Sequence, residues 1–180
     1  MDSIEFIRVY RRFVIRNHIQ MRIINFLLVS CLCIASLYAQ QNMPSVEVQN
    51  IDGDNINIGE YTKDGKTKII SLWATWCGPC RTELKALHQV YPTWKEKYDI
   101  EIVAITVDRG RMLDRAKDMF KVNGWDYTFF HDNNDELMSA FNITGIPFSI
   151  LVDGEGNIKS TQTGYFPGYE KELESKLKAL

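Results

Sequence analysis

The stretch Ser71-Leu-Trp-Ala-Thr-Trp-Cys-Gly-Pro-Cys-Arg-Thr-Glu83 decides the fold of this chain. It places Cys77 and Cys80 three positions apart, directly after an apolar run that suits a buried strand. A helix is expected to begin at about Pro79, because proline in the first helical turn needs no hydrogen-bond donor and has its φ preset. The cysteine pair therefore falls at the junction between a buried strand and a helix.

The residues around this pair suit disulfide exchange. Thiolate is the attacking species in that reaction, so a redox cysteine needs a lowered pKa and access to solvent. The unpaired N–H groups and partial positive charge of a helix amino terminus favour the thiolate form of Cys77. Cys77 would attack a substrate disulfide, and Cys80, one turn later, would resolve the mixed disulfide. Gly78 and Pro79 form the tight connection, and Trp76 offers a flat apolar contact surface.

The amino-terminal part of the chain has the pattern of a targeting segment. After Met21, a basic residue precedes an apolar stretch that ends in the small residue Ala39, before polar Gln40. This is the pattern of a signal peptide, and we expect cleavage after Ala39. Met21 is then a candidate for the true start besides Met1, and residues 1–20 would be an upstream mis-start if translation begins at Met21.

Two alternatives for this segment stay open. Residues 23–39 form an apolar stretch at the lower edge of what spans a bilayer, so a retained membrane anchor is one. The other is lipidation of Cys31, since Leu28-Val-Ser-Cys31 resembles a bacterial lipobox. In each case residues 1–39 are a targeting segment and residues 40–180 are the folded domain.

The cysteine count sharpens the assignment. The chain has 180 residues and four cysteines, and loss of residues 1–39 removes Cys31 and Cys33. Cys77 and Cys80 then have no partner except each other, so the exported body carries no structural disulfide framework. That body has 16 basic and 21 acidic side chains, which argues against nucleic-acid binding, because nucleic acid requires a basic face.

Strands and helices are expected to alternate along residues 40–180. The first helix should carry an apolar stripe at helical spacing and should kink or restart at Pro92. The expected stripe is Cys80, Leu84, Leu87, Val90 and Trp94. The expected strands are 45–54 (an edge strand with its hairpin), 69–74, 101–108, 127–131, 148–152 and 158–163. One helix is expected to begin at 79, and the others are expected at 111–122, 135–141 and 170–180. Residues 63–68 are expected to form a polar loop. This order indicates an α/β sheet with helices on its faces.

The motif Trp76-Cys77-Gly78-Pro79-Cys80 resembles the active-site motif of thioredoxins, and Gly145-Ile146-Pro147 resembles their cis-proline segment. The chain is most similar to the exported TlpA/ResA-like thiol–disulfide oxidoreductases. The signal sequence, the full Trp73–Glu83 run and an extra strand and helix before the proline carry this resemblance, which covers about residues 45–180. It implies a thioredoxin-like α/β fold: a central mixed β-sheet flanked by helices, with an amino-terminal β extension and one inserted βα unit.

The resemblance also implies roles for individual residues. Pro147 would be cis and lie against the cysteine pair, and the backbone of Ile146 would pair with an extended substrate segment. Glu83 matches an acidic residue that lines the active-site cavity in that group and acts in proton transfer. By like-charge repulsion a carboxylate there would raise the thiol pKa, opposing the helix terminus. The alternative for Glu83 is an ordinary carboxylate on the helix surface.

The chain also departs from the family at two points. Leu84-Lys85 follow Glu83, where many members have a proline. The buried aspartate of ordinary thioredoxins has no clear match, since Ile70 to Trp73 carry no acid.

Other chemistries fit the residues less well. A zinc site needs four ligands, and only His88 and His131 could complete one with the cysteines; both are expected to be structural or surface residues. The acidic turns 132–136 and 153–157 lack the spacing of a calcium loop. We therefore expect no metal and no cofactor beyond the redox-active Cys77–Cys80 disulfide. Peroxidases of this fold place a lone cysteine after Thr-x-x, which Thr75-Trp76-Cys77 does not match.

The sequence thus predicts an exported thiol–disulfide oxidoreductase in the periplasm or cell envelope. Reductase activity on protein disulfides is favoured, with apocytochrome c as one client by resemblance and a membrane electron donor for re-reduction. We expect a monomer that binds no nucleic acid. The alternative is a copper-binding metallochaperone or redox sensor of the same fold.

Overall fold

A computed structural model describes residues 20–21 and 41–180. The expected signal peptide, the lipobox cysteine Cys31, the cleavage point after Ala39 and the alternative anchor at 23–39 lie outside these described residues. Within the described ranges, no helix is both long enough and apolar enough to cross a membrane. Residues Gln41–Leu180 form one compact unit.

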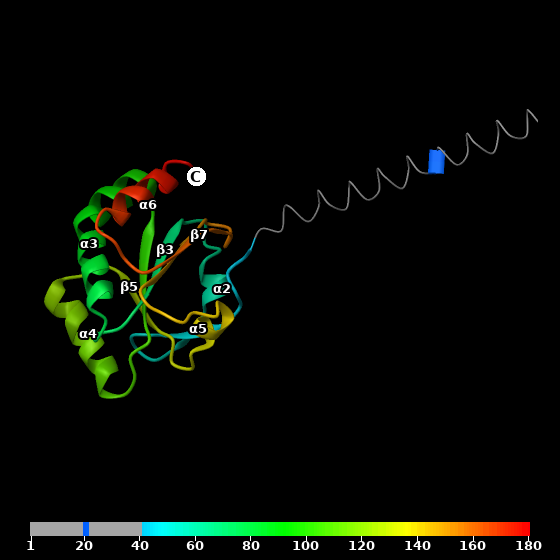
Figure 1. Ribbon diagram of the computed structural model, residues 1–180. Helices are drawn as coiled ribbons and strands as arrows, with labels where there is room; N and C mark the ends of the chain where they lie inside the picture. The colour runs from blue at the N-terminus through cyan, green and yellow to red at the C-terminus, as the bar shows by residue number, and fades with distance from the viewer. Residues whose placement is uncertain (1–19, 22–40) are drawn as a thin grey trace, which may run out of the picture. The chain divides into compact units, whose positions relative to one another are not determined.

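A mixed seven-stranded sheet is the centre of this unit, in the order β2-β1-β5-β4-β3-β6-β7 (Figure 1). Strands β3, β4 and β5 are parallel, and the other neighbouring strands pair antiparallel. The bounds are β1 Glu47–Asn50, β2 Asn55–Asn57, β3 Lys68–Trp73, β4 Glu101–Thr106, β5 Thr128–His131, β6 Phe148–Val152 and β7 Ile158–Thr163. The predicted mixed α/β sheet is confirmed.

Helices cover both faces of the sheet and enclose two separate cores. Helices α3, α4 and α6 lie on one face, and the short helices α2 and α5 lie on the other (Figure 1). Strand β3 is buried along its whole length, because successive residues alternate between the two cores: Ile69 and Trp73 face the first, Ile70 and Leu72 the second. The helices are α2 Ile58–Tyr61, α3 Gly78–Tyr98, α4 Arg111–Asn123, α5 Glu136–Ala140 and α6 Tyr169–Leu177.

The amino-terminal β extension differs from the expectation. Strand β1 was expected at the edge of the sheet, but it pairs with both β2 and β5, so β2 holds the edge. The hairpin itself is confirmed. Helix α2 was not predicted, because its four residues are too few to show a periodic pattern.

Two positions differ on either side of the cysteine motif. Lys68 was placed in a polar loop but begins β3, where its fully buried amino group contacts the carboxylates of Asp64 and Glu101. Helix α3 continues through Pro92 instead of restarting there. Tyr91, rather than the expected Val90, completes the buried stripe of this helix.

Candidate active site

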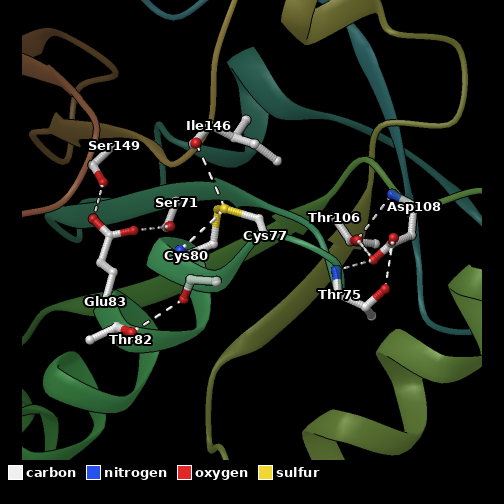
Figure 2. The surroundings of a disulfide bond; sticks show 11 residues. Ser71, Thr75, Cys77, Cys80, Thr82, Glu83, Thr106, Asp108, Ile146 and Ser149 are labelled. Carbon is white, nitrogen blue, oxygen red and sulfur yellow. Dashed lines mark hydrogen bonds between the residues drawn. A yellow bond between two sulfur atoms is a disulfide. The ribbon is translucent and has the colours of Figure 1, made fainter.

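Cys77 and Cys80 form a disulfide where β3 gives way to α3 (Figure 2). Cys77 is the residue that caps the helix, with φ −83° and ψ 104°, and its sulfur accepts a hydrogen bond from the Cys80 N–H at 3.2 Å. Gly78 and Pro79 form the first turn, as the sequence predicted. A helix N–H group therefore points at the sulfur that would carry negative charge in the reduced protein.

The two sulfur-bearing residues differ in how far solvent reaches them. Cys77 exposes 5% of its surface and Cys80 exposes none. Solvent access at Cys77 is much narrower than the sequence suggested, because the segment around Ile146 packs over the pair. Trp76 is 65% exposed and stands beside this narrow opening, as expected.

The second wall of the site is the segment before β6. The Ile146–Pro147 peptide bond is cis, as the resemblance implied. The carbonyl oxygen of Ile146 lies 3.7 Å from the Cys77 sulfur (Figure 2). The Gly164 N–H donates to the Pro147 carbonyl at 2.7 Å, so the end of β7 holds this segment in place.

Glu83 lies inside the protein rather than on the helix surface, so the surface alternative is wrong. Its side chain is fully buried, and its two carboxylate oxygens accept hydrogen bonds from Ser71 at 2.8 Å and Ser149 at 2.5 Å. Burial raises the pKa of Glu83 above its usual value, and the hydrogen bonds from Ser149 and Ser71 oppose that effect. Glu83 extends from α3 towards β6 in Figure 2.

The two serines were not identified from the sequence. Ser71 on β3 and Ser149 on β6 are direct partners in the antiparallel register, so their hydroxyls lie side by side under α3. The motif strand has no acid of its own, and Glu83 supplies a buried carboxylate to it from the helix. A polar residue within each of two apolar strand runs was the only available signal.

A second buried carboxylate lies at the other end of the motif strand, and the sequence did not reveal it. Asp108 follows β4, is 1% exposed, and accepts hydrogen bonds from Thr75 and Thr106 (Figure 2). The available signal was topological. The carboxyl ends of the parallel strands β3 and β4 meet, with Trp73 opposite Thr106, so an acid just after β4 reaches the loop just after β3.

His88 and His131 lie apart from the disulfide chemistry. His88 packs edge-on against the Tyr127 ring at 6.2 Å, and His131 is buried at the end of β5. In the part of the chain that the structure describes, no three His, Cys, Asp or Glu side chains are grouped so that they could hold a metal ion.

A sequence model of the AhpC/TSA family matches residues 39–161. The chain belongs to the AhpC/TSA family. Thiol-disulfide oxidoreductase ResA of Geobacillus kaustophilus is 27% identical over 135 residues, which cover 73% of this chain and 74% of the relative. ResA of Bacillus thuringiensis subsp. konkukian is 28% identical over 141 residues, covering 76% and 75%.

Solved structures agree with this placement. A thioredoxin-like protein from Porphyromonas gingivalis is 36% identical, with a TM-score of 0.69, covering 77% of this chain and 90% of that one. StoA from Bacillus subtilis, 24% identical with a TM-score of 0.57, covers 74% and 98% and shares the fold. The thioredoxin-like fold and the TlpA/ResA-like resemblance are confirmed, and the protein is a thiol–disulfide oxidoreductase.

Proposed function

We propose that this oxidoreductase is an exported reductase of protein disulfides. One observation carries the exchange step: in a single redox pair, Cys77 is narrowly open and Cys80 is fully closed to solvent. The reducing direction rests on the Gly78-Pro79 dipeptide between them, which resembles that of reducing thioredoxins. An incoming disulfide can meet Cys77 alone, so the open sulfur would attack and the closed one would resolve. The amino-terminal targeting pattern, with lipidation of Cys31 or a retained anchor as variants, supports export.

The exchange starts from the dithiol. The Cys77 thiolate attacks one sulfur of the client disulfide, forming a mixed disulfide and releasing the other client sulfur as a thiolate that takes up a proton. The Cys80 thiol loses its proton and attacks the Cys77 sulfur, which frees the second client thiol. The client gains two electrons, and the protein ends as the Cys77–Cys80 disulfide seen here.

Glu83 is the proposed acceptor of the Cys80 proton. It lies three residues after Cys80 on the buried side of α3, and burial raises its pKa above the usual value, which makes the carboxylate a better proton acceptor. Its charged form would also disfavour thiolate at the cysteines. A charged Glu83 would therefore raise the thiol pKa and oppose the effect of the helix terminus, whereas a protonated Glu83 would not.

The client-facing surface comprises Trp76, the Gly78-Pro79 turn and the Ile146-Pro147 segment. An extended client segment would lie on the backbone of Ile146 and against the exposed Trp76 ring, which suits protein disulfides. Apocytochrome c is one such client, by resemblance to the family. Each turnover leaves the disulfide, so a membrane electron donor must supply two electrons; no other cofactor is proposed.

The deciding experiment is the reduction potential of the Cys77–Cys80 couple in the mature protein, paired with insulin reduction. We expect a strongly reducing potential, near the −270 mV typical of reducing thioredoxins. Cys77→Ser should abolish turnover, and Cys80→Ser should accumulate the mixed disulfide on Cys77. A potential near that of strong oxidants, about −120 mV, would reverse the proposed direction. Tight Cu(I) binding without reductase activity would instead favour the metallochaperone.

A further inference from the structure

The loop that carries Cys77 is held by one buried carboxylate from another part of the chain, that of Asp108 after β4. Asp108 accepts hydrogen bonds from the Thr75 N–H at 2.7 Å, the Thr75 hydroxyl at 3.0 Å and the Thr106 hydroxyl at 2.9 Å (Figure 2). The two bonds from Thr75 end on different oxygens of the carboxylate. A shift of the Thr75 backbone would therefore disturb both bonds, and a rotation of its side chain would break the hydroxyl bond.

This anchor acts on the shortest segment of the site. Residues 74–76 make the whole connection between β3 and Cys77, the capping residue of α3, and the Cys77 N–H donates to the Ala74 carbonyl at 3.1 Å. Thr75 is the second residue of this turn. Where Thr75 is held decides where Cys77 stands relative to the first N–H groups of α3.

The negative charge of Asp108 has no basic partner among the described residues. Arg109, next in sequence, pairs with Asp135 at 2.5 Å. His131 lies opposite Thr106 in the sheet, and burial lowers its pKa, so the ring stays neutral at neutral pH. Buried carboxylates without a cation depend on hydrogen bonds for their stability. In Asp108 those bonds come from the active-site loop and from the end of β4.

We infer that Asp108 is a positioning residue for disulfide exchange: through Thr75 it fixes Cys77 at the start of α3, and it holds a negative charge on the loop two residues before Cys77. The inference concerns the exchange itself and holds for either direction of electron flow. It does not depend on Glu83 or on the client.

The restraint through Thr75 and the negative charge of Asp108 should both destabilise the reduced form of the cysteine pair. The disulfide already restrains Cys77, so the anchor removes more freedom from the dithiol than from the disulfide. The negative charge held at Thr75, two residues before Cys77, also disfavours a thiolate at Cys77. Loss of Asp108 should therefore stabilise the reduced form, which raises the reduction potential and lowers the pH at which Cys77 becomes reactive.

Asp108→Asn tests this directly, because it keeps the size of the side chain and removes its charge. We expect the equilibrium with a reference dithiol to shift about tenfold towards the reduced protein, which corresponds to about 30 mV. The midpoint of the pH profile of Cys77 alkylation should move to lower pH. Thr75→Val, which loses only the hydroxyl bond, should shift the equilibrium about threefold, and Thr75→Ser should match the wild type.

Asp132→Asn is the matched control. Asp132 is fully buried at the same edge of the sheet, but it accepts hydrogen bonds from the Leu137 and Met138 N–H groups of α5 rather than from the active-site loop. Its potential and alkylation profile should equal those of the wild type. An unshifted Asp108→Asn, or an equal shift in Asp132→Asn, would overturn the inference. If Asp108→Asn does not fold, identical potentials in Thr75→Val and Thr75→Ser would overturn it instead.

Discussion

Two buried carboxylates border the motif strand β3, and they are held in opposite ways. Both partners of Glu83 are serine hydroxyls, Ser71 and Ser149, which can rotate to donate or to accept. One partner of Asp108 is the backbone N–H of Thr75, which can only donate. The Glu83 environment therefore tolerates both protonation states of the acid, whereas the Asp108 environment fits an acceptor.

This difference fits the two different roles proposed for the two carboxylates. Burial raises the pKa of Glu83, which suits the proposed exchange of a proton with Cys80. Asp108 instead accepts hydrogen bonds from Thr75 in the loop after β3 and from Thr106 at the end of β4. A buried acid near a redox cysteine is thus not by itself a proton acceptor; the type of its partners decides its role.

The largest expected contrast is in stability at neutral pH. Asp108→Asn should lower the free energy of unfolding by about 2 kcal/mol, because hydrogen bonds to a charged acceptor contribute about 1.5–3 kcal/mol and an amide reproduces only part of the set. Urea denaturation of the oxidised protein at pH 7 measures this. A loss below about 0.5 kcal/mol, the range of ordinary surface substitutions, would remove the distinction.

Glu83→Gln should change the pH dependence of stability rather than abolish stability. Because the pKa of Glu83 is raised in the folded protein, folding favours the protonated acid. Wild-type stability should fall as pH rises from the ordinary value of 4.5 through the raised pKa, and Glu83→Gln should lack this fall. Urea midpoints across that range test the sign, with Glu96→Gln, an exposed position on the same helix, as the control.

The serines should act through Glu83 with a smaller effect. Ser71→Ala or Ser149→Ala removes one hydrogen bond that stabilises the charged carboxylate, so each should raise the pKa of Glu83 further. The expected loss is about 1.5 kcal/mol of unfolding free energy where Glu83 is charged, and less at acidic pH. Equal losses of unfolding free energy at acidic pH and at the pH where Glu83 is charged would show that the serines contribute packing alone.

His131 should give the smallest effect, with the opposite sign. Burial lowers its pKa below 6.5, so the folded protein favours the neutral ring. Its contribution is complete above 6.5 and is lost as pH falls through the lowered pKa. His131→Leu should remove the decrease in stability as pH falls below 6.5, and it should leave the pH dependence above 6.5 unchanged. Thermal unfolding between pH 4 and 7 checks this, and an unchanged acid slope would contradict it.

The sequence predicted the parts of the site that are local in the chain. The change from an apolar run to a helical stripe placed Cys77 at a helix start, and the motif pointed to Pro147. The partners of both carboxylates could not be predicted, because Ser149 is 66 residues from Glu83 and Asp108 is 33 from Thr75. Helical spacing placed Glu83 one turn from Cys80 but could not tell surface from interior, since β6 covers that position only in the folded sheet.

The narrow opening at Cys77 has a consequence for the choice of client. With 5% of the residue accessible, a disulfide recessed in a folded protein cannot bring its sulfur into line for attack. A disulfide on a protruding loop or an unfolded chain can. The opening would therefore select clients sterically, by how far their disulfides protrude from the client surface, before any client side chain is recognised.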